Sequence, residues 1–178
     1  MALKKKTPAD SLTTMTELVL PNDTNTLNNL MGGRLMYLMD ICGGIAAQRH
    51  SNRVVVTASV DNISFKEPIA LGDVVTIKGF VSRAFNSSME VYLEVTAGNV
   101  PQGTLRKTNR AFFTFVAVDQ AGNTINVPEL VPQTDKEKEL YAGALRRRQL
   151  RLILAGKMKP EDATELKSLF ENPPTMNP

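Results

Sequence analysis

The sequence predicts an α+β protein in which a five-stranded antiparallel sheet wraps around one central helix, with a C-terminal helical extension. Three observations predict this architecture. Residues 30–47 are apolar nearly all round, which indicates a helix that is buried rather than one that lies on a surface. Residues 53–118 then have β-strand character, and the composition becomes charged and helical after Pro128 and Pro132. A sheet that lays one face against a single buried helix is expected to curve around it.

Turn-forming residues mark the boundaries of the first strand and of the helix. Residues 11–20 alternate apolar and polar side chains and predict a strand, which Pro21 ends. Residues 25–29 form a polar loop rich in asparagine. The glycine pair at residues 32–33 lets the backbone pass tightly into a helix of about 15 to 18 residues. We expect this helix to end near residues 48–50, where cations suit the negative end of the helix dipole.

Four longer strands are expected to follow the helix. Residues 54–60 are mostly β-branched and contain no glycine or proline, and strand character resumes over residues 74–81 after a turn. Residues 89–95 alternate strictly, which predicts one buried face and one face in water. Residues 110–118 are apolar on both faces, which predicts a central strand.

The chain is expected to divide into a flexible tail over residues 1–10, a sheet-and-helix domain over residues 11–132 and a helical extension over residues 133–178. The extension begins with a charged helix over residues 135–154, and Gly156 closes it. A second short helix is expected to start at Pro160. The side chains expected to anchor the two helices are Leu140, Leu145, Leu150 and Ile153 in the first, and Ala163, Leu166, Leu169 and Phe170 in the second.

Composition limits the classes of function. The 178 residues are 42% hydrophobic and 22% charged, as in an ordinary globular domain that buries a core. A net charge of +3 is too small to indicate a nucleic-acid partner. No apolar run approaches the length of a membrane span, and residues 1–10 lack the apolar centre of a signal peptide. With Cys42 as the single cysteine, an intrachain disulfide is impossible and a cytoplasmic location is expected.

A single carboxylate interrupts the apolar helix. Between Leu30 and Ala47 only Arg34 and Asp40 carry charge. An ionised carboxylate is expensive to bury unless polar groups meet it. Asp40 is therefore either a satisfied structural acid or a group held in place for chemistry.

Several stretches of the sequence, in this order, carry a family resemblance. They are Asp23-Thr24-Asn25, Leu30-Met31-Gly32-Gly33-Arg34-Leu35-Met36-Tyr37-Leu38-Met39-Asp40, Arg53-Val54-Val55-Val56-Thr57-Ala58-Ser59-Val60-Asp61, Phe65-Lys66-Glu67-Pro68-Ile69, Gly72-Asp73-Val74-Val75 and Thr108-Asn109-Arg110-Ala111. Over residues 12–132 the sequence resembles the acyl-CoA thioesterases of the hotdog superfamily, in particular the group that contains brain-type acyl-CoA hydrolase and its bacterial relatives.

The resemblance implies a hotdog fold and an enzyme that hydrolyses acyl-CoA to a carboxylic acid and coenzyme A. It implies that Asp40 is the general base or the nucleophile, and that Asn25 comes from the opposite subunit of a homodimer. Such dimers often stack into a trimer of dimers, although a tetramer stays open. One departure is visible, because the family often has Gly or Asp near the positions of Asn28 and Asn29.

The residue types fit thioester hydrolysis, each with a plainer alternative. The amide of Asn25 can hold the water or the carbonyl, or simply form a turn or helix cap. The backbone N–H groups of Gly32 and Gly33 at a helix start favour a developing oxyanion, although the glycines also suit close helix packing. From their places in the family-like segments, the candidates for binding coenzyme A are Arg53, Ser87, Ser88 and Asn109, which are otherwise surface turn residues. The run Arg146-Arg147-Arg148 either reaches the phosphates or forms a solvated helix face.

Two other residues are expected to be structural. His50 follows the apolar helix without a Ser or Cys nucleophile nearby in a motif, so we expect a helix C-cap or a dimer contact. Cys42 is expected to be a small buried hydrophobe. The sequence contains no metal-ligand cluster and no phosphate loop, so no metal or cofactor is expected.

Two other functions are weighed against hydrolysis. One is a hydratase or dehydratase that acts on acyl thioesters, which typically pairs a histidine with an acid at the helix entrance; residues 25–33 contain no histidine. The other is a non-catalytic acyl-CoA sensor, which usually carries a helix-turn-helix. Residues after 133 show no convincing one.

Overall fold

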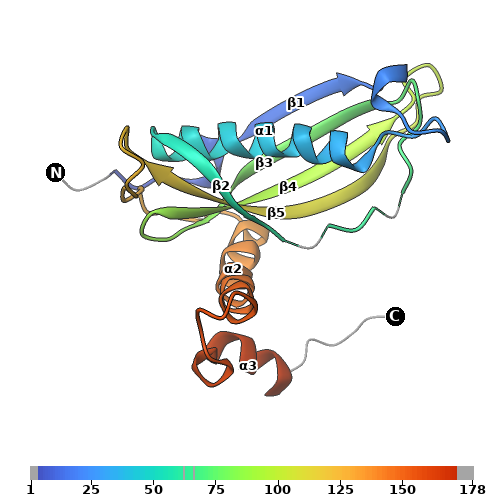
Figure 1. The fold of residues 1–178 in the computed structure, drawn as a ribbon. Coiled ribbons are helices and arrows are strands. Elements are labelled where there is room, and N and C mark those ends of the chain that lie inside the picture. Colours follow the sequence, from blue (N-terminus) through green and yellow to red (C-terminus); the bar gives the residue numbers. More distant parts are fainter. Residues whose placement is uncertain (1–3, 62, 66, 172–178) are drawn as a thin grey trace. The chain divides into compact units, whose positions relative to one another are not determined.

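A five-stranded antiparallel sheet and the long helix that lies against it form the first part of the chain (Figure 1). The computed structural model describes residues 4–61, 63–65 and 67–171. The chain divides into two compact units, Met1–Gln133 and Thr134–Pro178. The predicted architecture of a curved sheet around one central helix is confirmed for the first unit.

The order of elements along the chain matches the prediction. The order of the strands across the sheet could not be inferred from their local patterns. The elements of the first unit are β1 (Thr13–Leu18), α1 (Gly32–Ser51), β2 (Val54–Val60), β3 (Val74–Ala84), β4 (Ser88–Gly98) and β5 (Arg106–Val118), with short 3₁₀ helices η1 (Pro8–Ser11) and η2 (Pro21–Asp23). Across the sheet the strands run β1-β3-β4-β5-β2, each antiparallel to its neighbours. The edge strands are therefore β1 and β2, and β2 directly follows α1 in the chain.

The core lies between α1 and the face of the sheet that meets it. Leu93 of β4 and Phe115 of β5 are fully or almost fully buried there. A Cβ atom built on Gly43 would come within 2.9 Å of the Phe115 ring, so α1 approaches the sheet closely at this point. Cys42 is completely buried on the same helix, as expected, and the loss of hydration raises the pKa of its thiol to about 11.

The strand β4 differs from its predicted pattern because both of its faces are buried at the middle. Tyr92, which the alternation placed in water, lies between the rings of Phe80 and Phe112, at centroid distances of 5.6 and 5.4 Å. Glu90 is also buried and accepts a hydrogen bond of 2.7 Å from the Ser82 hydroxyl. A period of two shows that the faces differ in polarity but does not show what covers each one. The middle strand is β4 rather than β5, which lies between β4 and β2.

The segment before β1 is not the flexible lead-in that the sequence predicts. Lys6 donates its backbone N–H to the carbonyl of Glu129 at 2.9 Å, and Val131 donates to the carbonyl of Lys6 at 2.8 Å. The buried hydroxyl of Ser11 in η1 accepts a hydrogen bond from the N–H of Val81. These partners lie far away in the sequence, so local composition could not indicate them. The expectation for residues 1–3 lies outside the described residues.

The second unit contains α2 (Asp135–Leu154), η3 (Pro160–Asp162) and α3 (Thr164–Glu171). A capping box between Thr134 and Glu137 starts α2, and the side-chain oxygen of Gln149 accepts a hydrogen bond from the N–H of Leu166. Phe170 is 81% exposed and therefore does not anchor α3 as expected, whereas the expected anchor Ala163 is buried. The side chain of Leu169 lies outside the described residues.

Candidate functional site

Asp40 lies on α1 and meets the neighbouring strand β2. It is half-buried, and its Oδ1 accepts a hydrogen bond of 2.7 Å from the hydroxyl of Thr57. The register of β2 shifts between Thr57 and Ser59, a bulge of the kind that re-aims a side chain. The sequence does not indicate Thr57 as a partner of Asp40, because a strand pattern does not show which helical residue a side chain contacts. The structure thus gives the lone carboxylate of the helix one fixed partner and leaves Oδ2 without a partner among the described residues.

The N-terminus of α1 is open. Its N-cap residue is Met31, which offers no side-chain hydrogen bond to the first turn. Unpaired N–H groups and the positive end of the helix dipole therefore lie together at Gly32 and Gly33. A Cβ atom on Gly32 would come within 3.3 Å of the Phe65 ring, whereas one on Gly33 would meet nothing within 4 Å. Gly32 therefore has the packing role that the sequence left open, while nothing described in the chain occupies the space beside Gly33.

Asn25 is held by its own loop in a definite orientation. Its Oδ1 accepts hydrogen bonds from the N–H groups of Leu27 at 2.9 Å and Asn29 at 3.2 Å. The oxygen is thereby used, and the Nδ2 amide remains as a donor. Asn28 has a left-handed backbone with φ of 56°, so its role is to turn the chain.

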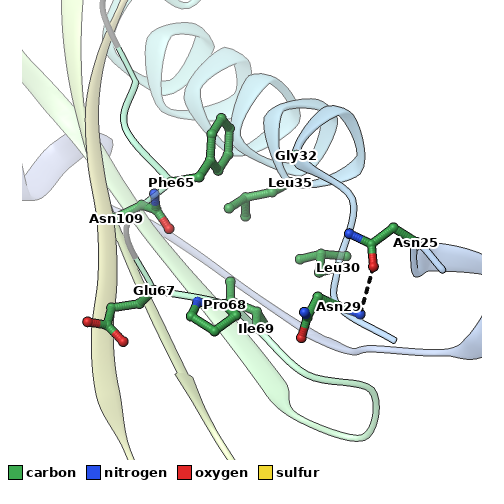
Figure 2. Close-up of a pocket in the computed structure, with 10 residues that line it drawn as sticks. All are labelled: Asn25, Asn29, Leu30, Gly32, Leu35, Phe65, Glu67, Pro68, Ile69 and Asn109. Carbon is green, nitrogen blue, oxygen red and sulfur yellow. Dashed lines mark hydrogen bonds between the residues drawn. The ribbon is translucent and has the colours of Figure 1, made fainter. Parts of the chain in front are cut away.

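The loop of Asn25 and the start of α1 form one side of a pocket of about 390 Å³ (Figure 2). Apolar residues make up most of its wall, and three asparagines and one glutamate add polar groups. The lining residues are Asn25, Asn29, Leu30, Gly32, Leu35, Phe65, Glu67, Pro68, Ile69 and Asn109. Two predicted catalytic residues, Asn25 and Gly32, and one predicted coenzyme A residue, Asn109, are thus brought together.

Asp40 and Thr57 are not part of this pocket. Eight residues separate Gly32 from Asp40 on α1, which corresponds to about 12 Å along the helix axis. One reacting carbonyl could not touch both the helix start and the carboxylate of the same chain. Asp40 and the pocket therefore lie at different places along one helix.

The surface around Asp40 has the character of an interface. The strand β2 is a sheet edge whose outer side is unpaired among the described residues. Val54 is 64% exposed there, and Val56 is also exposed. On α1, Met36 and Tyr37 are exposed one turn before Asp40. An apolar edge strand of this kind is a surface on which another chain can pair.

The other predicted coenzyme A residues lie at the opposite end of the sheet from the pocket. Ser88 pairs with Val116, whereas Asn109 pairs with Val95, seven residues further along β4 and β5. At the rise of a strand this separation is about 23 Å. Ser87 adjoins Ser88, and Arg53 is exposed just before β2, whose first residue pairs with Val118 at that same end. Within one chain the structure therefore brings only Asn109 to the pocket.

His50 is completely buried in the last turn of α1 and belongs to the core rather than to a site. Its Nε2 is 2.8 Å from the carbonyl oxygen of Pro128, and its buried Nδ1 has no partner among the described residues. Burial is the main cause that lowers the pKa of His50 below its ordinary value of 6.5. The two expected roles are a helix C-cap and a dimer contact. The C-cap residue is Asn52, and a dimer contact is wrong because the His50 ring is fully buried within one chain.

Two features are absent from the described residues 4–61, 63–65 and 67–171. In that part of the chain no three His, Cys, Asp or Glu side chains converge as metal ligands do. No helix there combines the length and hydropathy needed to cross a membrane.

The sequence is similar to known thioesterases. A family model described as the thioesterase superfamily matches residues 27–104. An uncharacterised acyl-CoA thioester hydrolase of Bacillus subtilis is 38% identical over 138 residues, which are 78% of this chain and 80% of the relative. The human cytosolic acyl coenzyme A thioester hydrolase is 37% identical over 154 residues, and there the match spans 40% of the longer relative.

Solved structures with the same fold include close matches. The crystal structure of an apo-hexameric acyl-CoA thioesterase has a TM-score of 0.83 at 38% identity and covers 86% of this chain and 98% of its own. An acyl-CoA hydrolase of Staphylococcus aureus, solved in complex with butyryl coenzyme A, coenzyme A and coenzyme A disulfide, has a TM-score of 0.80 at 34% identity. It covers 86% of this chain and 96% of its own.

Proposed function

The chain belongs to the thioesterase superfamily, in the group of the acyl-CoA thioester hydrolases, and from this membership we propose that it hydrolyses acyl-CoA to a carboxylic acid and coenzyme A at a site shared by two copies. The observation that carries the proposal is the placement of Asp40. Its carboxylate accepts a hydrogen bond from Thr57, and exposed apolar side chains of α1 and β2 lie nearby in the sequence. It lies too far from the helix start of its own chain to act there.

A two-fold axis beside β2 and the exposed face of α1 would complete the site. In an isologous dimer the same surface meets itself, so the helices of the two copies run in opposite directions. The start of α1 in one copy then lies beside the middle of α1 in the other. Asp40 of one chain would thereby reach the thioester held by Asn25 and Gly33 of its partner.

The proposed chemistry uses protein groups and water. The open N–H groups at Gly32 and Gly33 stabilise the negative charge that develops on the thioester oxygen. The Nδ2 amide of Asn25 holds the carbonyl or the water. As general base, Asp40 takes a proton from the water whose oxygen attacks the carbonyl carbon, the C–S bond breaks, and the thiolate of coenzyme A receives a proton. Direct attack by Asp40 would form an anhydride that water then hydrolyses, and this route remains the alternative.

The assembly and the location follow from the same premise. We propose that dimers stack into a trimer of dimers, which is supported by the hexameric relative, with a tetramer as the alternative. Arg53, Ser87 and Ser88 of one copy would then hold the coenzyme A whose thioester lies at the pocket of the other copy. No metal or cofactor takes part in this proposal, and the expected location is the cytoplasm.

The two other functions make different demands on the site. A hydratase would need a histidine at the helix start, but His50 lies at the far end of α1 against Pro128. A non-catalytic sensor would bind acyl-CoA without consuming it.

A thiol-release assay with acetyl-CoA, palmitoyl-CoA and a hydroxybenzoyl thioester separates these functions. Hydrolysis of at least one substrate is expected, unchanged by a metal chelator, and Asp40→Asn should lower kcat by about 10² to 10⁴-fold without lowering the Tm. The matched control is Asp135→Asn, an exposed carboxylate of α2, which should leave kcat unchanged. Release from no substrate, or full activity of Asp40→Asn, would contradict the proposal.

A further inference from the structure

One buried polar atom in the pocket wall has no partner. Asn109 is 8% exposed, and its Nδ2 donates a hydrogen bond of 2.6 Å to the carbonyl of Ser64. A carbonyl oxygen can only accept, so this bond fixes which side of the amide is the nitrogen. The Oδ1 of Asn109 is therefore the atom that faces away from Ser64, and it is buried with no partner among the described residues.

This oxygen faces a pocket whose wall is mostly apolar. Figure 2 shows it turned toward the pocket, on the side of Phe65, Leu35 and Pro68. A carbonyl oxygen left without a hydrogen bond in such a place costs about 1 to 3 kcal/mol. In native proteins such an atom usually accepts a hydrogen bond from a ligand or a water, or coordinates an ion. None of the three neighbouring side chains has a donor to offer.

We propose that the pocket receives the part of the thioester beside the reacting carbonyl, and that Asn109 selects ligands that bring an N–H or O–H donor to its Oδ1. This inference rests on the proposed function, because Gly32 and Asn25 of the same pocket are the groups that meet the carbonyl there. Two parts of an acyl-CoA supply such a donor, the amide of the pantetheine arm and a hydroxyl on the acyl chain. The apolar walls accept the methylene groups between the donor and the carbonyl.

The physical consequence is discrimination rather than mere affinity. A ligand without the donor leaves Oδ1 dehydrated and unpaired, so it loses transition-state stabilisation that a matched ligand keeps. An apolar side chain at position 109 removes that penalty.

The experiment compares kcat/KM for two substrate pairs that differ only in a donor. Butyryl-CoA against 3-hydroxybutyryl-CoA tests an acyl hydroxyl. Butyryl-N-acetylcysteamine against the butyryl thioester of an alkanethiol of equal length tests the pantetheine amide.

The variants are Asn109→Leu, which removes the acceptor, and Asn109→Asp, which keeps an acceptor but loses the donor to Ser64. Thr108→Val, a buried neighbour whose hydroxyl bonds Val95, is the control.

The wild type should prefer the donor-bearing member of at least one pair by about tenfold or more. Asn109→Leu should bring that ratio close to one, while Asn109→Asp and Thr108→Val keep it. Which pair responds identifies the source of the donor. An equal fall of all four substrates in Asn109→Leu, or an unchanged ratio, would overturn the inference and leave the proposed hydrolysis standing.

If the wild type hydrolyses none of these four substrates and none of the three in the thiol-release assay, the proposed function fails. Calorimetric binding then decides the inference. Weaker binding of coenzyme A or of 3-hydroxybutyryl-CoA by Asn109→Leu would support it, provided that the variant still binds the butyryl thioester of the alkanethiol as the wild type does. Equal affinities of wild type and variant would overturn it.

Discussion

The two ends of α1 differ in the hydrogen-bond partners that the chain supplies to them. At the C-terminal end the chain supplies partners: Asn52 caps the helix in a left-handed conformation, and Lys6 donates to the carbonyl of Arg49 and the side chain of Asn52. His50 is bonded to Pro128 in the same region. At the N-terminal end no side chain caps the first turn, and the space beside Gly33 is open. Every helix has unpaired groups at both ends, so an end left open beside a pocket indicates a site for a ligand.

Gly33→Ala should give the largest separation between activity and stability. Alanine favours a helix over glycine by up to about 1 kcal/mol, and a Cβ atom there meets nothing in the chain, so the variant should be as stable as the wild type or more so. The added methyl would displace the thioester, and kcat/KM should fall roughly 10- to 100-fold. The measurements are kcat/KM and urea unfolding.

Gly43→Ala is the matched comparison on the buried face of α1. Its Cβ would come within 2.9 Å of Phe115, so this variant should lose stability instead. If Gly33→Ala were fully active, or if both variants behaved alike, the open end of the helix would have no special role.

Thr57→Val tests the hydrogen-bond partner of Asp40. The substitution keeps the shape of the side chain and removes the hydrogen bond to the carboxylate. A bond to a charged group contributes about 1.5 to 3 kcal/mol, so kcat should fall by roughly 10- to 100-fold, with KM almost unchanged. Thr57→Ser keeps the hydroxyl and should recover most of the activity. A variant Thr57→Val with normal kcat would show that Asp40 needs no positioning.

At the C-terminal end of α1, a substitution of His50 should affect stability and have almost no effect on activity. Burial lowers the pKa of His50 in the folded protein, whereas in the unfolded chain it stays near 6.5. Below about pH 6.5 the unfolded chain therefore binds more protons, and the free energy of unfolding should decrease as the pH falls. His50→Leu should remove this part of the pH dependence.

The check is urea unfolding of wild type and His50→Leu at about pH 7.5 and about pH 5.5. Activity per folded molecule should be unchanged at the higher pH. A steep loss of kcat in His50→Leu at normal stability would show that the C-terminal end of α1 also belongs to the site. The two ends of the helix would then not differ in function.

The helix and the strands were predictable because their hydrophobic periods are local properties of the sequence. The placement of Asp40 on this helix was predictable for the same reason, while its catalytic role stays a prediction. Thr57 was not, because the contact between β2 and α1 depends on a bulge and on tertiary packing. The free oxygen of Asn109 was equally hidden, since its burial depends on segments around residues 25–35 and 64–69.

The buried outer face of β4 and the ordered start of the chain were mispredicted for a related reason. Their partners lie far away in the sequence, as with Tyr92 between two rings and Lys6 beside residues 129–131. Local pattern and composition report polarity, whereas burial depends on what the fold brings to each surface.

The central claim is that Asn25 of one chain works with Asp40 of another, and mixing two inactive variants tests it most directly. Asn25→Ala and Asp40→Ala chains are combined, exchanged and assayed for thiol release, with subunit exchange verified by native mass spectrometry. Each mixed dimer would hold one intact site, so equal mixing should restore about a quarter of the wild-type activity. No recovery despite verified exchange would mean that both residues act within one chain, and would contradict the account.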